Sequence, residues 1–535
     1  SMAFYRIALL GHPVFSEGDP VWDCFEQLSV EGHAVEIIDL ERFPGVFDSD
    51  GNPDERALEA FRRRFKPDYI AASGESAEEI LSRLERSSCE GSAVPFRRFV
   101  VFGYVGKDNF GDELIFSTIC DEIARRHPDS FVTLIGHDPE ATLRRHGVVS
   151  VTTDMKLEAD IILDGASALV FMAGIIFDDP FVDWTAGPID LFLNPRSEIA
   201  GQTAFVLMAA MHGTPSVFLG IGAGPLSNPD AKRLVALSAR NGAFFVPRDV
   251  KTEELLLAAG VPETSISTKC DLAFLAKSDN AFAPADYAQP YCVVSLRDHR
   301  TKDEGFEGRV ADVLDRVWKG SGIRPLFIDL APEDGVVHRR VASLMAHREE
   351  ARFFGTALDT DAVIDAIAHA EFSMAMRLHC SIVSNAHGVP SLGFDYNEKV
   401  HAFYEQMGQL AFLSSMDESA AETLQRIELL IKQRDHLSEE LSVIVEDRKR
   451  RAAEAFDILD GLANRNPKRQ EKRHLYTRST SIEEVGLVEA RACANRRAQE
   501  LQELRAKLDE IEESTSWKVG CAVTVIPRII RDRLS

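Results

Sequence analysis

Arg377 and His379 stand two positions apart, between an apolar run at 371–376 and a segment typical of a helix. Arginine is a permanent cation whose planar guanidinium fits a phosphate or a carboxylate, and histidine titrates near neutral pH. A helix start also presents unpaired N–H groups, here from Leu378 onward, and these favour an anion. The pattern therefore indicates a site that binds and protonates a small phosphorylated acid.

The same pattern has a structural explanation that the pair alone does not exclude. Arg377 could form an ion pair with a nearby acid, and His379 could be a core histidine whose hydrogen bonds are satisfied. For an isolated Arg-x-His, this explanation is the more common one, so the choice depends on the rest of the chain.

Five segments, in order along the chain, carry the residue types of one known family. They are GYVGKDNFGDE at 103–113, GIGAGPL at 220–226, PRD at 247–249 with Leu255, Leu256 and Gly260, DLAF at 271–274, and MRLH at 376–379 with NAHGVP at 385–390 and FDYNEKV at 394–400. Through them, residues 99–400 resemble the polysaccharide pyruvyl transferase family. Each segment alone is a weak signal, but five in the right order are specific.

Two positions depart from the family pattern. The family usually has three glycines after a strand that ends in aspartate, whereas this chain has Asp164, Gly165, Ala166 and Ser167. Thr252 stands where the family prefers serine after Arg-Asp, and there the hydroxyl is kept. The first departure makes a close approach of backbone to ligand less certain at that position.

The resemblance implies a reaction and a donor. Phosphoenolpyruvate would give its enolpyruvyl group to two hydroxyls of a sugar, in a bacterial polysaccharide or its lipid-linked precursor, and phosphate would leave. His379 would protonate the methylene carbon, while Arg377 and the N–H groups from Leu378 onward would hold the phosphate and the carboxylate. No metal and no cofactor besides this donor substrate is expected, since the histidines lack the spacing of metal ligands.

A second guanidinium is expected in the donor site. The resemblance assigns Arg248, from the Arg-Asp motif, to that role. Arg297, at the end of a predicted strand, is an addition from the residues themselves, and a salt bridge with Asp298 explains it equally well. Further residues are expected at the cleft or on the acceptor side: Gly106, Asn109, Asp112, Glu113, Gly222 and Lys399.

Three of these residues have two interpretations each. Asp112 and Glu113 could accept hydroxyl protons, but capping of the helix that follows Gly111 is the better supported role. Lys399, close to Tyr396, could contact substrate or brace the cleft.

The composition limits the classes of binding partner and the cellular compartment that we expect. The 535 residues carry a net charge of −25, so a polyanion such as nucleic acid is not an expected partner and an anionic substrate needs a local cationic pocket. The eight cysteines form no Cys-x-x-Cys pair and are expected to be reduced. With no segment typical of a signal peptide or a membrane span, we expect a cytoplasmic protein, with its tail as a candidate contact to the inner face of the membrane.

The alternation of apolar runs predicts an α/β protein. Residues 1–95 predict a small domain with a parallel sheet, from strands at 7–10, 35–38 and 69–72 and helices at 22–32, 55–65 and 76–86. Two facing doubly wound, Rossmann-like lobes follow, in a GT-B-like arrangement. The first lobe, 98–280, has strands expected at 99–102, 131–135, 161–163, 216–220 and 244–246; the second, 288–415, carries Arg-Leu-His and has strands expected at 291–296, 326–328, 372–376 and 391–394. Their matched motifs follow strands, where such sheets bind ligands.

The tail, 416–535, differs from the rest in composition. It predicts a helix at 424–459, a basic linker at 464–478, a second helix with a heptad pattern near 487–511 and a basic amphipathic end at 518–535. A homo-oligomeric coiled coil and a single packed helix explain the heptads equally well. A membrane surface and a partner protein explain the end equally well.

Two other functions remain open from the sequence. A GT-B glycosyltransferase with a nucleotide-sugar donor would use the same anion site and release a nucleoside diphosphate instead of phosphate. A catalytically idle scaffold of a glycan-assembly complex would need neither Arg377 nor His379.

Overall fold

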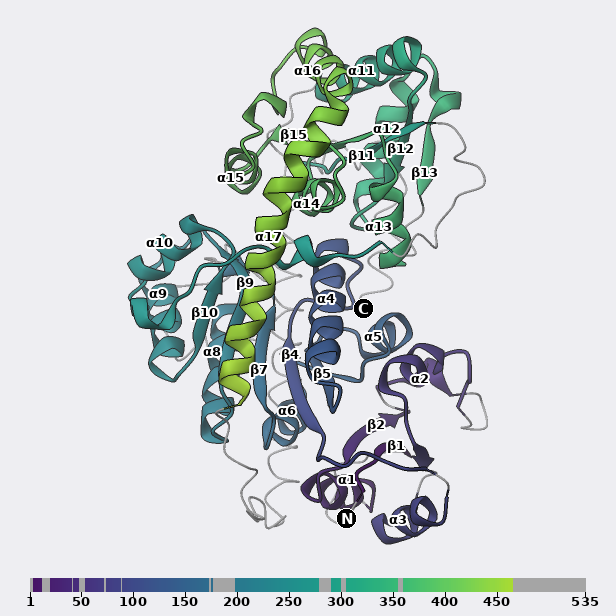
Figure 1. Ribbon diagram of the computed structural model, residues 1–535, viewed down its shortest axis with the longest axis vertical. Helices are drawn as coiled ribbons and strands as arrows, with labels where there is room; N and C mark the ends of the chain where they lie inside the picture. Colours follow the sequence, from purple (N-terminus) through teal and green to yellow (C-terminus); the bar gives the residue numbers. More distant parts are fainter. Residues whose placement is uncertain are drawn as a thin grey trace, which may run out of the picture. The chain divides into compact units, whose positions relative to one another are not determined.

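The computed structural model describes residues 3–11, 20–40, 42–47, 53–71, 74–87, 89–172, 175–176, 198–278, 290–299, 305–354 and 359–464 (Figure 1). Within these ranges, the strands form three parallel sheets of three, seven and six strands. Most strand residues are apolar and buried, because helices cover both faces of such sheets.

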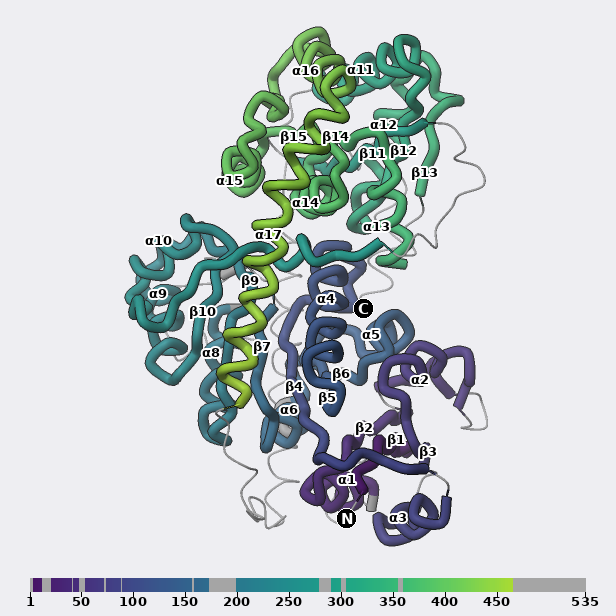
Figure 2. The backbone as a smooth tube through the Cα atoms, viewed as in Figure 1, coloured from purple at the N-terminus to yellow at the C-terminus, as the bar shows by residue number. Residues whose placement is uncertain are grey.

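The N-terminal sheet has the order β2-β1-β3. Its strands are β1 (Arg6–Gly11), β2 (Ala34–Asp39) and β3 (Tyr69–Ala71), and its helices are α1 (Pro20–Val30), α2 (Glu59–Phe65) and α3 (Ala77–Arg86) (Figure 2). The predicted alternation is confirmed, although α2 starts at Glu59 instead of residue 55. Glu36 of β2 lies 3.5 Å from Arg98 of the next sheet, with both side chains buried, so this domain is joined to its neighbour by an interior ion pair.

The second sheet has the order β10-β9-β7-β4-β5-β6, with β8 paired to β9. Its strands are β4 (Arg97–Phe102), β5 (Ser130–Gly136), β6 (Ser150–Thr152), β7 (Ala168–Met172), β8 (Ile175–Ile176), β9 (Ser216–Ala223) and β10 (Phe244–Pro247). The helices are α4 (Phe110–Arg126), α5 (Pro139–His146), α6 (Lys156–Leu163), α8 (Glu198–Met211), α9 (Pro229–Arg240) and α10 (Val250–Ala258), with short 3-10 turns η3 (Glu263–Ser265) and η4 (Leu272–Leu275).

One predicted strand of this lobe is wrong. Residues 161–163 are the last turn of α6, which ends at Leu163 and is followed by Asp164 at the C-cap and by Gly165, with φ of +72°. Three apolar residues are too few to separate the helical period from the strand period. The strand is β7, which follows Ser167. Residues 164–167, where the chain departs from the family's three glycines, therefore lie before the strand. The residues directly after the strand, 173–174, lie outside the described ranges.

The third sheet has the order β13-β12-β11-β14-β15-β16. Its strands are β11 (Tyr291–Ser295), β12 (Arg324–Ile328), β13 (Arg352–Phe354), β14 (Phe372–Ala375), β15 (Ser391–Asp395) and β16 (Leu413–Ser415). Its helices are α11 (Phe306–Ser321), α12 (Asp334–Leu344), α13 (Thr360–Ala368), α14 (Leu378–Ala386) and α15 (Glu398–Gln406), with turns η6 (Arg348–Glu350) and η7 (Leu410–Phe412). The strand order reverses between β11 and β14, and ligands in doubly wound folds bind beyond the carboxyl ends of strands at such a point. The predicted pair of doubly wound lobes is confirmed.

The C-terminal segment that the sequence predicts as one helix is two, α16 (Ala420–Lys432) and α17 (Arg434–Ala463), separated at Gln433. Helix α17 contacts both lobes (Figure 1). Ser438 donates to the Gly388 carbonyl at 2.7 Å in the second lobe, and Arg126 of the first lobe donates to Asp460 at 2.7 Å. Its buried stripe is Leu437, Leu441, Val445, Ala452, Ala455, Phe456, Leu459 and Ala463.

The predicted helix at 487–511 and the basic end at 518–535 lie outside the described residues, so the coiled coil and the membrane contact stay predictions. Over the described part of the chain, no helix combines the length and apolar content that a bilayer crossing requires.

Candidate functional site

The start of α4 in the first lobe meets the start of α14 in the second. The Phe110 N–H donates to the Leu330 carbonyl at 2.9 Å, a hydrogen bond between the lobes. Next to it, a Cβ added to Gly111 would lie 2.2 Å from Nδ1 of His379. Only glycine therefore fits at 111, and the Gly-rich motif of the first lobe and the Arg-Leu-His motif of the second share one site.

His379 is the best candidate for chemistry at this junction. Its side chain is 22% exposed, and its Nε2 atom is buried, has no hydrogen bond and lies 3.8 Å from Oδ2 of Asp271. Burial lowers the pKa of His379; Asp271 opposes this, while Arg248 and other nearby cations lower the pKa further. The imidazole is therefore neutral near pH 7 without a ligand, and a bound dianion would favour its protonated form.

Asp271 is a functional candidate that the sequence analysis missed. It is 5% exposed and stands at the N-cap of η4, where Oδ1 accepts the Ala273 N–H at 3.0 Å. Its Oδ2 accepts from Nη1 of Arg248 at 3.1 Å and faces His379. The signal for it was the DLAF motif, which the sequence analysis matched to the family without giving its aspartate a role.

Arg248 and Gly222, both predicted site residues, lie together. The Arg248 N–H donates to the Ile221 carbonyl at 2.9 Å, which fixes the end of β10 against β9. A Cβ on Gly222 would lie 2.9 Å from Nη2 of Arg248, so the glycine makes room for the guanidinium. The hydroxyl of Thr252 accepts the Ala223 N–H at 3.1 Å, which explains why a serine or a threonine serves there.

Lys399, in the first turn of α15, lies near two arginines and has no ion pair with any described residue. Burial lowers the pKa of Lys399 to about 8, and the charges of Arg248 and Arg297 contribute. Asp249 and Asp112 act in the opposite direction, which places Asp112 of the first lobe within electrostatic reach of Lys399. The site therefore holds cations close together at a cost that an anionic ligand would relieve.

Arg297 follows β11 and lies over an aromatic ring. Its guanidinium carbon is 5.9 Å from the centre of the Tyr396 ring, and its Nε is buried without a hydrogen bond. Asp298, the partner that the sequence suggested, pairs instead with Arg340 at 3.3 Å.

Arg377 has the carboxylate partners that the sequence left open. Its Nε and Nη2 donate to Asp334 at 3.0 and 2.6 Å, and Nη2 donates to Glu333 at 2.7 Å. Arg377 occupies the N-cap of α14 without capping it through its side chain, so the first N–H groups of that helix, including Leu378, are left for another acceptor. Because two carboxylates pair with one guanidinium, Arg377 and its partners bring no net positive charge to the site.

The remaining predicted residues on α4 separate into different roles. Asn109, and neither Asp112 nor Glu113, is the N-cap of α4, and its side chain accepts the Gly111 N–H at 3.3 Å. Glu113 is completely buried and accepts from the Gly106 N–H at 2.9 Å. It also lies 2.7 Å from Nε2 of His146 and 3.2 Å from Arg145. Gly106 and Glu113 thus fix the loop between β4 and α4.

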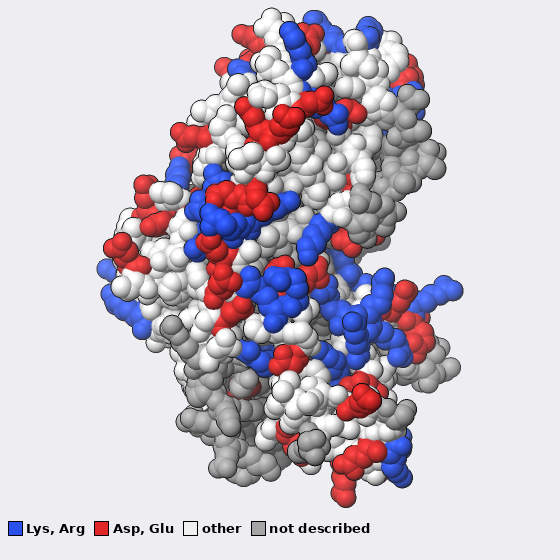
Figure 3. Space-filling model, viewed as in Figure 1, with Lys and Arg blue, Asp and Glu red and all other residues white. Residues whose placement is uncertain are grey.

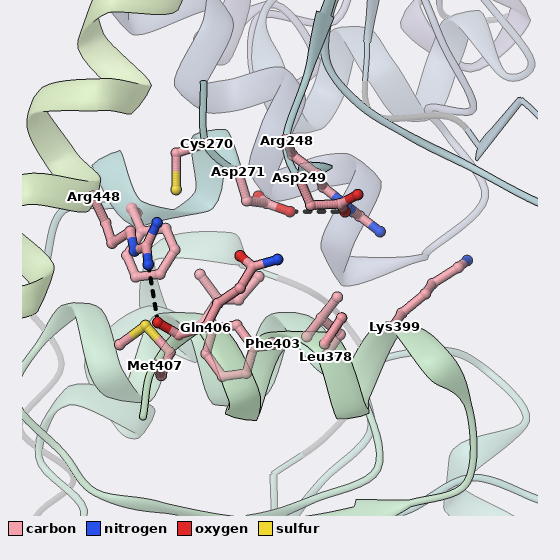
Figure 4. A pocket seen from close by; sticks show the side chains of 13 residues that line it. Arg248, Asp249, Cys270, Asp271, Leu378, Lys399, Phe403, Gln406, Met407 and Arg448 are labelled. Carbon is pink, nitrogen blue, oxygen red and sulfur yellow. Dashed lines mark hydrogen bonds and ion pairs between the residues drawn. The ribbon is translucent and has the colours of Figure 1, made fainter. Parts of the chain in front are cut away.

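A narrow pocket lies between the two lobes beside this cluster (Figure 4). Arg248, Asp249 and Asp271 of the first lobe lie along one wall, and Leu378 and Phe403 of the second lobe lie along the facing wall. Lys399 and Arg448 stand at opposite ends. Arg448 comes from α17, and the sequence analysis missed it because it is one of many charged residues on a tail helix. Across the described ranges, no cluster of three or more His, Cys, Asp or Glu could hold a metal ion.

The family described as polysaccharide pyruvyl transferase matches residues 109–398. No curated protein matches.

Among solved structures, UDP-GlcNAc 2-epimerase from Methanocaldococcus jannaschii is 9% identical, with 68% of this chain and 100% of that chain covered at a TM-score of 0.49. S. aureus MnaA with UDP is 10% identical, with 70% and 100% covered at 0.47. Anabaena Alr3699/HepE with UDP and glucose is 12% identical, with 69% and 97% covered at 0.43. Likenesses at this level support neither a fold assignment nor an activity.

Proposed function

This chain belongs to the polysaccharide pyruvyl transferase family, and we propose that it transfers the enolpyruvyl group of phosphoenolpyruvate to two hydroxyls of a sugar, forming a cyclic ketal and releasing phosphate. The acceptor is a sugar of a bacterial polysaccharide or of its lipid-linked precursor. The observation that carries the proposal is the unpartnered Nε2 of His379, buried within 3.8 Å of Asp271 and next to Arg248.

Donor binding in this proposal depends on three cations with incomplete partners. Arg248 pairs with Asp271 at 3.1 Å and lies 3.6 Å from Asp249, whereas Arg297 and Lys399 have no ion pair with a described residue. A phosphate dianion and a carboxylate placed among them would relieve their mutual repulsion. Arg377, held by Asp334 and Glu333, forms no hydrogen bond from Nη1 to a described residue, so it can add a preoriented donor, and the α14 N–H groups from Leu378 onward can add more.

His379 would act as the general acid. Donor binding raises its pKa, the imidazolium gives its proton to the methylene carbon, and positive charge develops on the adjacent carbon. One sugar hydroxyl bonds to that carbon and gives its proton to a neighbouring carboxylate. The C–O bond to phosphate then breaks, the second hydroxyl closes the ketal, and its proton leaves with phosphate or a carboxylate. Asp112 is the candidate carboxylate, because its charge acts on Lys399 in the site, whereas Glu113 is committed to the loop before α4.

The test is His379→Gln, which keeps the size and polarity of the side chain and removes the titratable proton. We expect phosphate release from phosphoenolpyruvate to fall by about 10²–10⁴-fold, the usual contribution of general acid catalysis. Phosphoenolpyruvate affinity, measured by calorimetry, should change little. His387→Gln is the matched control, since His387 ends the same helix and its Nδ1 lies 2.9 Å from the Val383 carbonyl oxygen. A His379→Gln enzyme with wild-type phosphate release would contradict the proposal.

A further inference from the structure

A second, wider cavity of about 550 Å³ lies beside the narrow pocket. The two share Arg248, Asp249, Ala402, Gln406 and Arg448 in their walls. The wider cavity has the size of a site for a small molecule, whereas the donor needs only the cluster around His379. A molecule in this cavity would lie next to the proposed donor.

The walls of the wider cavity are rich in cations. They contain five Lys or Arg side chains against three Asp or Glu side chains, in a chain whose net charge is −25. Figure 3 shows Lys and Arg gathered over the middle of α17, next to a smaller group of acids. Such a local excess in an acidic protein favours an anion in the cavity.

Two guanidiniums of α17 are the best placed to bind that anion. Arg448 and Arg451 are three positions apart and thus share a face of the helix. Arg448 donates to the Gln406 carbonyl at 3.0 Å, which uses one of its N–H groups. Arg451 forms no hydrogen bond or ion pair with a described residue, although both arginines are half-buried.

The other basic side chains around the cavity, Arg248, Lys251 and Lys269, have carboxylate partners. Lys251 pairs with Glu398, and Lys269 lies 2.9 Å from Glu454. Arg450, between the two guanidiniums in sequence, is 61% exposed, pairs with Asp447 and Glu454, and does not line the cavity. The unused donors are therefore concentrated at Arg448 and Arg451.

The geometry points to a phosphate-binding site for the acceptor: Arg448 and Arg451 hold the diphosphate of a sugar diphosphate, whose sugar reaches Arg248 and the donor. This inference rests on the proposed function for the identity of the neighbouring reaction. Adjacent guanidinium forks suit the oxygens of a diphosphate, and a neutral sugar would need no cations there. The diphosphate belongs either to a nucleotide sugar or to a prenyl-linked sugar.

The test is calorimetric titration of the full chain with inorganic pyrophosphate, in the presence of saturating phosphoenolpyruvate to fill the donor site. Arg451→Gln should weaken pyrophosphate binding about tenfold to a hundredfold, the loss expected for a charge-assisted hydrogen bond. Arg448→Gln combined with Arg451→Gln should weaken it further. Arg450→Gln, on the same helix, should bind as the wild type does. Thermal unfolding checks that each variant is folded.

Equal pyrophosphate affinity in the wild type and the double variant, or no binding to the wild type, would overturn the inference. Titration with phosphoenolpyruvate alone is read separately, so a failure of the donor proposal leaves this result interpretable. Titrations with UDP-glucose and with a prenyl diphosphate sugar distinguish a nucleotide sugar from a prenyl-linked sugar. The acceptor is the ligand that binds more tightly to the wild type and loses affinity in Arg451→Gln.

Discussion

Two buried pairs of histidine and carboxylate occur in the first lobe and at its junction with the second, and they differ in how completely they are bonded. His146 lies 2.7 Å from Glu113, which also accepts the Gly106 N–H and faces Arg145. His379 lies 3.8 Å from Asp271 and its Nε2 has no hydrogen bond. A buried polar group without a partner is costly, and a ligand that supplied the missing bond to His379 would remove that cost. Completeness of bonding thus distinguishes the pair that holds the loop before α4 from the pair that we propose acts on the donor.

Breaking the satisfied pair should have the largest effect on folding. Glu113→Ala removes the acceptor for the Gly106 N–H and leaves a buried histidine and Arg145 without their carboxylate. We expect a loss of about 3–5 kcal/mol in the free energy of unfolding, the usual cost of breaking a buried ion pair from one side. Urea denaturation measures it. Asp271→Asn keeps an oxygen for the Ala273 N–H, and Arg248 keeps Asp249 at 3.6 Å, so this variant should lose less stability; an equal loss in both variants would remove the distinction between the pairs.

Displacing the unsatisfied imidazole should affect activity more than stability. In Gly111→Ala, the new Cβ would meet Nδ1 of His379 at 2.2 Å, so the imidazole must shift. A displacement of about 1 Å at a catalytic group costs roughly a hundredfold in rate, measured as kcat for phosphate release. Gly201→Ala is the control, because no atom lies within 4 Å of the added Cβ in α8. Similar kcat values in the two variants would show that His379 needs no defined position.

The second unpaired group, Lys399, should make donor binding depend on pH. Burial lowers its pKa to about 8, below the ordinary value of a lysine, so the amine loses its proton in the free protein above that pH. An anionic donor needs the charged form. The contribution of Lys399 to donor affinity should therefore be full below pH 8, and it should fall about tenfold per pH unit above that pH, measured by calorimetry between pH 7 and 9.

Lys399→Arg keeps the charge at every accessible pH, since a guanidinium does not deprotonate there. The decline above pH 8 should disappear in that variant. A decline that persists would assign the pH dependence to another group.

A satisfied hydroxyl beside the site should give the smallest effect. Thr252→Val keeps the shape of the side chain and leaves the Ala223 N–H without its acceptor, at a cost of about 1–3 kcal/mol. Thr252→Ser keeps the acceptor and should unfold close to the wild type. Thermal unfolding compares the two, and a stable Thr252→Val variant would show that water replaces the hydroxyl.

The sequence was a good guide to elements and a weaker guide to contacts. Long apolar runs identified most of the longer strands, because strands covered on both faces read as continuous apolar stretches, but β7, which lies between β9 and β4, and the two-residue strand β8 were not predicted. The short strands β6, β13 and β16 were missed, and a three-residue apolar run in α6 was predicted as a strand. Three residues are too few to show either the helical or the strand period.

At the site, motif order indicated Arg248, Gly222 and His379 as neighbours, and the structure places them around Asp271. The motif order gave no role to Asp271. It also gave no signal for Arg448, because Arg448 lines the pocket only through the tail helix α17, which contacts both lobes. The carboxylates that hold Arg377 come from α12, more than forty positions earlier, and no local pattern predicts such a pairing.

Helix α17 gives the chain a second covalent route between its lobes, after the segment that first leads from one sheet to the next. Because both crossings belong to one polypeptide, the facing walls of the cleft meet at a high effective concentration even when no substrate bridges them. Bringing the proposed catalytic groups together then costs no translational entropy. The binding energy of each substrate is therefore available for distinguishing it from other molecules.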